Sequence, residues 1–239
     1  MPPSAERARN WLVVSGIALA IGTAIIAYPY VLDAVLERFG VRAVASALAG
    51  LAALSLALPG RTSVRAVALE AAPVLGFPVL LMLAAVTNEQ IYLRLVPALV
   101  YLTLAGIFAS SLRAPDSLIE RGARYLVPAI PLFIRSYCRK VTGVWVAFFA
   151  ASALMIAALA VADLPDWWRA TSGGLIYACM IGITVVEFFV RKTWFRYYYH
   201  DGLFDRLWSR IFPAENTARG RASLDYIQRH RDALRSRAR

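Results

Sequence analysis

The feature that most constrains this sequence is a succession of six apolar stretches of about the length that crosses a lipid bilayer. A transmembrane helix needs roughly 20 mostly apolar residues. Hydrophobic residues make up 59% of the chain and charged residues only 17%, whereas soluble domains have about 25% charged residues. The stretches lie near 11–32, 42–58, 71–86, 91–112, 141–162 and 174–190. The sequence therefore predicts an all-α fold, a polytopic bundle of about six spans over residues 1–190, followed by a basic cytoplasmic tail over 191–239.

Lys and Arg are distributed unequally among the loops between these stretches. Cytoplasmic loops of membrane proteins collect Lys and Arg, so their distribution predicts orientation. If the N-terminus is inside, all but four of the 26 basic residues lie on the cytoplasmic side, the exceptions being Arg38, Arg42, Arg94 and Arg169. We therefore expect a multi-pass protein with both termini in the cytoplasm. Nucleic acid is not an expected partner, because no basic face on a soluble fold is visible.

Three stretches outside the spans have patterns of helices that lie on a membrane surface. The first, near 117–127, opens with a capping-box pattern at Ser117 and Glu120 and would lie in the interface or pack over the ends of the spans. The second, near 202–212, has one continuous apolar stripe, typical of an interfacial helix or of a helix that binds a partner. The third, near 220–237, is basic and weakly amphipathic. The residues expected to meet anionic headgroups are Arg121, Arg124, Arg135, Arg139, Lys140, Trp194, Tyr198, Trp208, Arg210, Arg229, Arg231 and Arg235.

Few residues offer catalytic chemistry. Glu187 lies at the inner end of the sixth stretch, and Arg191 four residues later provides a partner on the same helix face. His200 and Asp205 have the His-x4-Asp spacing that many glycerolipid acyltransferases use, but no α/β domain surrounds the pair. We therefore favour a protein without enzymatic activity, with His200, Asp205 and Glu187 as the catalytic candidates to test. The two cysteines share no metal-type spacing, so neither a metal nor a cofactor is expected.

Several short segments between residues 88 and 196 together form a characteristic pattern. They are residues 93–100 with Pro97, Ser111-Leu112, residues 118–121, Pro128 with Pro131, residues 137–142, Trp145 with Phe148-Phe149, and residues 187–191. In these segments the chain resembles a family of small bacterial inner-membrane proteins, often encoded among fatty-acid or polyketide-type genes for aryl polyene or xanthomonadin-like pigments. Residues 118–121 and 145–149 are also distantly similar to segments of intracellular septation protein A. The resemblance implies a location in the bacterial inner membrane rather than a mechanism.

The resemblance and the basic cytoplasmic residues together favour a non-enzymatic component that supports envelope-lipid or polyene-pigment biogenesis. Such a protein would hold cytoplasmic enzymes at a bilayer with anionic headgroups. Acidic acyl-carrier or synthase proteins are the expected partners, because their charge complements a basic surface. Two alternatives stay open. One is a membrane enzyme that acts on an acyl or lipid substrate, and the other is a lipid or pigment transporter subunit, which would need a polar or lateral cavity between spans.

Overall fold

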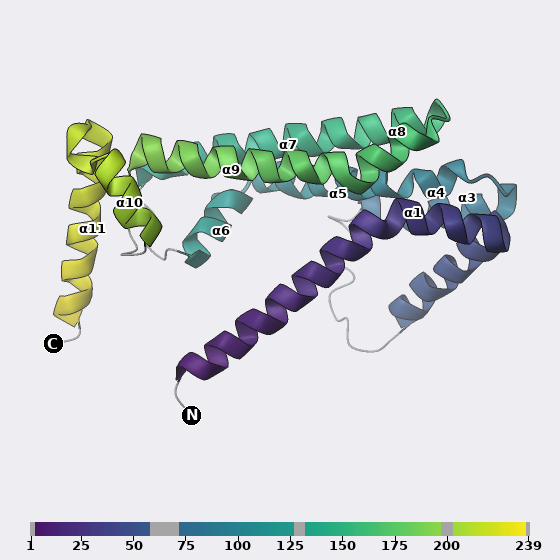
Figure 1. Cartoon of the computed structure of the whole chain (residues 1–239), viewed down its shortest axis with the longest axis horizontal. Coiled ribbons are helices and arrows are strands. Elements are labelled where there is room, and N and C mark those ends of the chain that lie inside the picture. The colour runs from purple at the N-terminus through teal and green to yellow at the C-terminus, as the bar shows by residue number, and fades with distance from the viewer. Residues whose placement is uncertain (1–2, 58–71, 127–131, 197–202, 238–239) are drawn as a thin grey trace. The chain divides into compact units, whose positions relative to one another are not determined.

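The structure is a computed structural model, and it describes residues 3–57, 72–126, 132–196 and 203–237 (Figure 1). Within these ranges the chain is helical and contains no strand, so the predicted all-α class is confirmed. In chain order the elements are α1 (Pro3–Ala57), α3 (Ala72–Thr87), α4 (Ile91–Arg94), α5 (Val96–Ser111), α6 (Leu118–Leu126), α7 (Leu132–Val161), α8 (Pro165–Ala170), the π-helical η1 (Thr171–Leu175), α9 (Ile176–Phe195), α10 (Leu203–Ile211), the 3-10 turn η2 (Ala214–Asn216) and α11 (Ala218–Arg237).

Three of the described helical segments are long and apolar enough to cross a membrane. They are Ile91–Ser111, Ile134–Val161 and Pro165–Phe195, and a shorter apolar helix covers Gly76–Thr87. Their length and composition are those of a membrane protein. The segments correspond to the predicted fourth, fifth and sixth spans. The count of six spans stays a prediction.

The first two predicted spans both lie within α1, which is interrupted at Gly40. This residue has φ 77° and ψ 161°, so α1 consists of two helical parts that meet at a kink. Residues with a Cβ atom essentially never adopt this backbone conformation, whereas glycine does so readily. The kink falls in the loop that the sequence predicts between 11–32 and 42–58.

Three other helices end in a left-handed residue. Asn88 follows α3 with φ 63°, Asp163 follows α7 with φ 49°, and Arg196 follows α9 with φ 49°. A left-handed residue is a common way to stop a helix, and Asn and Asp tolerate this conformation better than most residues. These three positions therefore set where the chain leaves α3, α7 and α9.

The chain forms two compact units, and each is described by itself. The first contains Met1–Thr103 and Phe149–Ala178, and the second contains Leu104–Phe148 and Cys179–Arg239. In the first unit, α3 packs closely on α5, because a Cβ atom at Gly76 would lie 3.1 Å from Leu99 Cδ1. The fully buried side chains of this unit include Leu81, Leu93, Ile156 and Trp168.

A polar cluster joins α1, α4 and the connection from α7 to α8 in the first unit. Arg94 Nη1 donates to Asp163 Oδ1 at 2.7 Å, and Arg169 Nη1 donates to Asp33 Oδ2 at 2.8 Å. The buried Trp168 indole donates from Nε1 to the Arg94 carbonyl at 3.0 Å. All these residues belong to loops that the sequence predicts on the outer side of the membrane or to the adjoining ends of the spans.

Candidate functional site

Glu120 is the centre of an ion-pair network that joins α6 to the start of α7 in the second unit. Its side chain is 1% exposed, and its Oε1 accepts from Arg124 Nη2 at 2.7 Å and from Arg135 Nε at 2.6 Å. Asp116 Oδ2 accepts from Arg124 Nη1 at 2.9 Å, and Asp116 Oδ1 also binds Arg135. Two carboxylates therefore face two guanidinium groups. This balance compensates the burial of the Glu120 charge, which would otherwise be costly.

The start of α6 is capped differently from the pattern in the sequence. Ser117 directly precedes α6, but its Oγ has no hydrogen-bond partner among the described residues. Ser111 acts instead: its Oγ accepts from the Leu118 N–H at 3.1 Å and donates to the Phe108 carbonyl at 2.7 Å. The capping-box prediction was thus right about where the helix begins and wrong about its bonds. Glu120 Oε1 instead binds two guanidinium groups, which carry a full positive charge.

Arg139 fixes the chain that follows α5. Its Nη1 donates to the carbonyl of Ala114 at 3.1 Å, and its Nη2 donates to the carbonyl of Leu112. The last carbonyls of a helix have no partner within the helix, so a guanidinium near them satisfies groups that would otherwise need water. Arg139 therefore binds backbone of its own chain.

The basic tail is docked on the end of α9. Phe195 is buried together with Ile134 and Cys138, and its ring meets Tyr137 edge-on at 5.1 Å. The Phe195 carbonyl accepts from the hydroxyl of Ser223 on α11 at 2.8 Å, and Ser223 is fully buried. The first turns of α11 are consequently part of the folded second unit.

The turn before α11 depends on a glycine. A Cβ atom at Gly220 would lie 2.0 Å from the Ala214 carbonyl oxygen, which is closer than any side chain can approach. The Gly220 N–H donates to Thr217 Oγ1 at 3.1 Å, so Thr217 caps the start of α11. Together these contacts set the direction in which α11 leaves η2.

The apolar stripe of α10 divides into two parts. The Trp208 ring lies 5.2 Å from the Phe189 ring of α9 and 5.9 Å from the Phe212 ring. Leu207 and Ile211 are instead exposed, at 53% and 57%. One part of the stripe therefore packs on α9, and the other presents apolar side chains outward.

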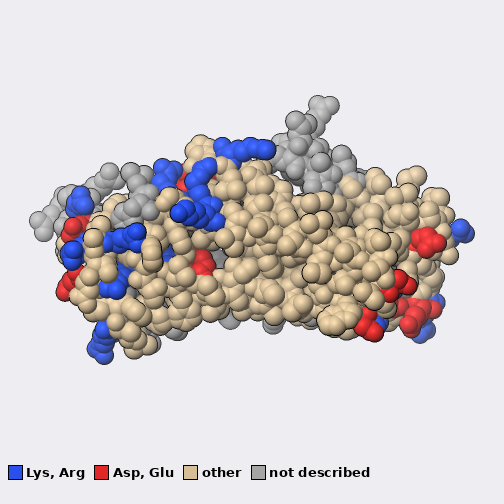
Figure 2. Space-filling view, turned by 90° about the horizontal axis from the view of Figure 1, so that it is seen from above, with Lys and Arg blue, Asp and Glu red and all other residues tan. Residues whose placement is uncertain are grey.

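The predicted headgroup-binding residues consequently fall into distinct groups. Arg121, Lys140, Arg210 and Arg229 are exposed. Arg124, Arg135 and Arg139 bind groups of their own chain, as described above. Trp208 packs on α9, and Trp194 is 56% exposed. Arg231 and Arg235 lie on α11, whereas Tyr198 lies outside the described residues. Figure 2 shows Lys and Arg side chains gathered on the side of the view where Figure 1 places α10 and α11.

The described parts of the chain do not show the catalytic candidates Glu187, His200 and Asp205 together in one site. Glu187 forms the expected pair with Arg191, with Arg191 Nε 3.4 Å from Glu187 Oε1. Asp205 lies on α10, and His200 lies outside the described residues. Within the described ranges, no group of three or more His, Cys, Asp or Glu side chains could hold a metal ion.

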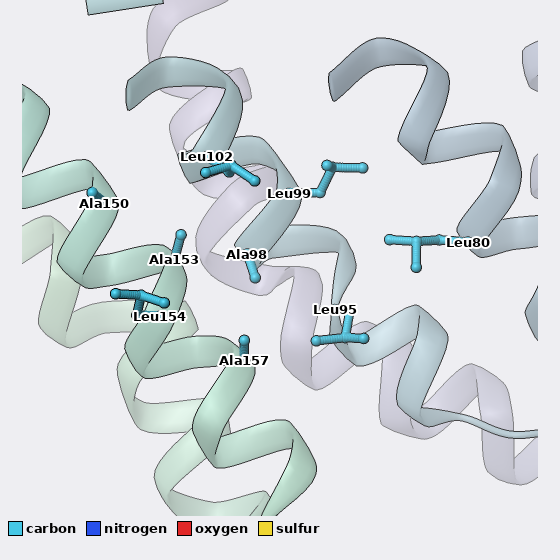
Figure 3. Close-up of a pocket in the computed structure, with 9 residues that line it drawn as sticks. All are labelled: Leu80, Leu95, Ala98, Leu99, Leu102, Ala150, Ala153, Leu154 and Ala157. Atoms are coloured by element: carbon cyan, nitrogen blue, oxygen red, sulfur yellow. The ribbon is translucent and has the colours of Figure 1, made fainter. Parts of the chain in front are cut away.

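A lateral apolar groove lies in the first unit, and the sequence did not predict its position. Its volume is about 400 Å³, and its lining contains almost no polar surface. Figure 3 shows the lining residues, which come from α3, from α5 with the residue before it, and from α7: Leu80, Leu95, Ala98, Leu99, Leu102, Ala150, Ala153, Leu154 and Ala157. The alanines of α7 recur at helical spacing, which was the signal available in the sequence. Their small side chains leave space beside α5.

Comparison with known proteins finds no family model, no curated protein and no solved structure that matches this chain. The resemblance to pigment-cluster membrane proteins therefore stays a prediction. Two features bear on function: the exposed basic residues of the second unit and the apolar groove of the first.

Proposed function

We propose that this chain is a six-span protein of the bacterial inner membrane with both termini in the cytoplasm. Three long apolar helices, the shorter apolar helix Gly76–Thr87 and the kink at Gly40 support this count. The polar cluster around Arg94 and Asp163 is consistent with outer loops that meet one another. The division of the α10 stripe supports an interfacial position, since Leu207 and Ile211 would enter the leaflet while Arg210 stays in the headgroups.

We further propose that the protein is a non-enzymatic scaffold for acidic soluble proteins, with acyl carriers or synthases of lipid or pigment biogenesis as the favoured class. Arg113, Arg121 and Lys140 are exposed and form what we call the basic surface. The observation that carries the proposal is that the backbone next to these residues is held in place. The ion pair of Glu120 with Arg135 and the bond from Arg139 to the Ala114 carbonyl form this frame. A preorganised frame loses less conformational entropy on binding.

The test is the affinity of the full-length protein, in nanodiscs of neutral lipid, for a purified acidic acyl-carrier protein. The double variant Arg121→Gln with Lys140→Gln removes two charges from the basic surface. The matched control, Arg38→Gln with Arg42→Gln, removes two exposed charges from the first unit. We expect about a tenfold loss of affinity in the first variant at low salt and a smaller loss at high salt, because salt screens exposed charges.

Equal affinity of the two double variants would reject recruitment through the basic surface. An affinity that does not change with salt concentration would also reject it. Binding through complementary charges should depend on where the charges lie and should weaken as salt screens them.

The apolar groove supports a second candidate, in which the protein binds an apolar acyl or polyene chain for transport or transfer. Ala150 lines the groove, and the neighbouring Ala151 is exposed elsewhere on α7. Ala150→Leu would narrow the groove, whereas Ala151→Leu adds the same volume outside it. We expect a fluorescent polyene fatty acid to bind several-fold more weakly to the Ala150 variant alone, since a filled groove excludes the chain. Equal binding by both variants would count against this candidate.

A further inference from the structure

The guanidinium of Arg219 is stacked on an exposed tryptophan. Arg219 Cζ lies 4.4 Å from the centre of the Trp194 ring, which joins the start of α11 to the end of α9. Trp194 is 56% exposed, and Arg219 is exposed as well. Stacking occupies the face of a guanidinium and leaves the N–H groups at its edge available. Arg219 has no hydrogen bond or ion pair to another residue in the described parts of the chain.

The other arginines at this end of α9 already have partners. Arg191 pairs with Glu187 at 3.4 Å, and Arg196 donates to the Pro213 carbonyl and lies 6.0 Å from the Phe212 ring centre. Arg221 Nη1 donates to the Glu215 carbonyl at 2.7 Å. Unlike these three arginines, Arg219 has N–H donors that bind no other described residue. A ligand for those donors should carry negative charge on oxygen atoms.

An apolar stripe on α9 leads to the stacked pair. Val186, Val190 and Trp194 follow one another at i, i+4 and i+8, so they share one helix face. They are 61%, 40% and 56% exposed, and Val186 and Val190 lie inside the segment Pro165–Phe195 that is apolar enough to cross a membrane. In a bilayer this stripe would face acyl chains. Tryptophan at the end of a span characteristically lies at the level of the headgroups.

We propose that Arg219 and Trp194 form a binding site for one phospholipid. The Arg219 N–H groups donate to the phosphate oxygens, and an acyl chain lies along Val190 and Val186. Arginine suits this role because its fork of donors matches a phosphate in two-bond geometry. The bond from Ser223 to the Phe195 carbonyl and the close contact of Gly220 with Ala214 fix α11, so the Arg219 position is prepared before the lipid arrives.

The site depends on the membrane placement in the proposed function, and it is independent of any protein partner. Retention of lipid can therefore fail while recruitment of an acidic protein succeeds, or the reverse. The lipid would join α9 to α11, which gives the basic tail a direct connection to the leaflet.

Native mass spectrometry of the full-length protein in detergent, titrated with phosphatidylglycerol, tests the proposal. Arg219→Gln removes the phosphate donors, and Arg38→Gln removes the same charge from an exposed position on α1. We expect the apparent Kd for the first lipid to rise about tenfold for Arg219→Gln and to change less than about twofold for Arg38→Gln, in keeping with the strength of charge-assisted hydrogen bonds.

Two further arms separate the parts of the site. Trp194→Leu keeps an apolar side chain but removes the ring, and Arg219→Lys keeps the charge but loses the planar stack; both should weaken lipid binding by several-fold. Inorganic phosphate at millimolar concentration should fail to displace the lipid, because the acyl chain contributes to binding. Equal loss in the Arg219→Gln and Arg38→Gln variants, wild-type retention by Arg219→Lys, or displacement by phosphate alone would overturn the proposal.

Discussion

Glu120 shows how a buried carboxylate is paired within a largely apolar chain. Its side chain is almost wholly buried, yet Arg124 and Arg135 both bind its Oε1. Such a site needs opposite charges beside the buried one, because the desolvation of one unpaired ion is costly. The remaining Glu120 oxygen, Oε2, has no hydrogen-bond partner within the described ranges. The network therefore depends on the charge of this residue more than on its size.

Glu120→Gln should destabilise the second unit by about 1–3 kcal/mol, the usual cost of losing a charged hydrogen-bond partner inside a fold. The change keeps the volume of the side chain and one oxygen acceptor, but it leaves Asp116 as the carboxylate that pairs with both Arg124 and Arg135. Thermal unfolding in detergent measures the effect. Glu89→Gln, at an exposed position, is the control and should leave the unfolding temperature unchanged. Identical unfolding temperatures for the two variants would show that the network contributes no stability.

Among the elements, the long apolar helices were the most predictable from the sequence and the bonds between them the least. The length of the apolar stretches predicts the helices of 91–112, 141–162 and 174–190, since a helix satisfies the backbone of a span within one segment. The capping role of Ser111 and the binding of carbonyls by Arg139 join residues that a local pattern does not connect. The local pattern around Arg139 accordingly predicts a headgroup contact, whereas the structure shows bonds to backbone carbonyls.

The tail helices show the same limit. The apolar stripe of α10 was visible from its periodicity, but its division between Trp208 and Leu207 depends on the position of Phe189 on another helix. The docking of α11 through Ser223 was likewise not visible, because one serine in a basic helix has no pattern. The candidate lipid site was missed for a related reason: Arg219 and Trp194 belong to different helices.

The attachment of α11 can be tested by a pair of glycine substitutions. Gly220→Ala would raise the helix propensity of α11 and should nevertheless release it, because the new Cβ atom collides with the Ala214 carbonyl. Gly122→Ala in α6 meets nothing within 4 Å and should stabilise its helix by up to about 1 kcal/mol. Limited trypsin digestion at Arg229 measures release, and we expect faster cleavage only in the Gly220 variant. Unchanged cleavage would mean that the close contact does not hold α11.

At the scale of the whole molecule, each unit has its own concentration of polar residues. In the first unit, Arg94, Asp163 and Arg169 join the segments predicted to lie outside. In the second unit, the loop around Glu120 and the tail carry the basic residues predicted to lie inside. The proposed scaffold and the proposed lipid site both require this second set to face the cytoplasm.

The most direct test of that requirement is the labelling of single introduced cysteines by a membrane-impermeant maleimide in intact spheroplasts. Glu89→Cys probes a position predicted outside, and Arg121→Cys and Arg229→Cys probe positions predicted inside; all three are exposed. The unsubstituted chain, with Cys138 buried and Cys179 exposed, provides the background. We expect labelling of Glu89→Cys in intact spheroplasts and labelling of the other two only after lysis. Labelling of Arg121→Cys or Arg229→Cys before lysis would contradict it.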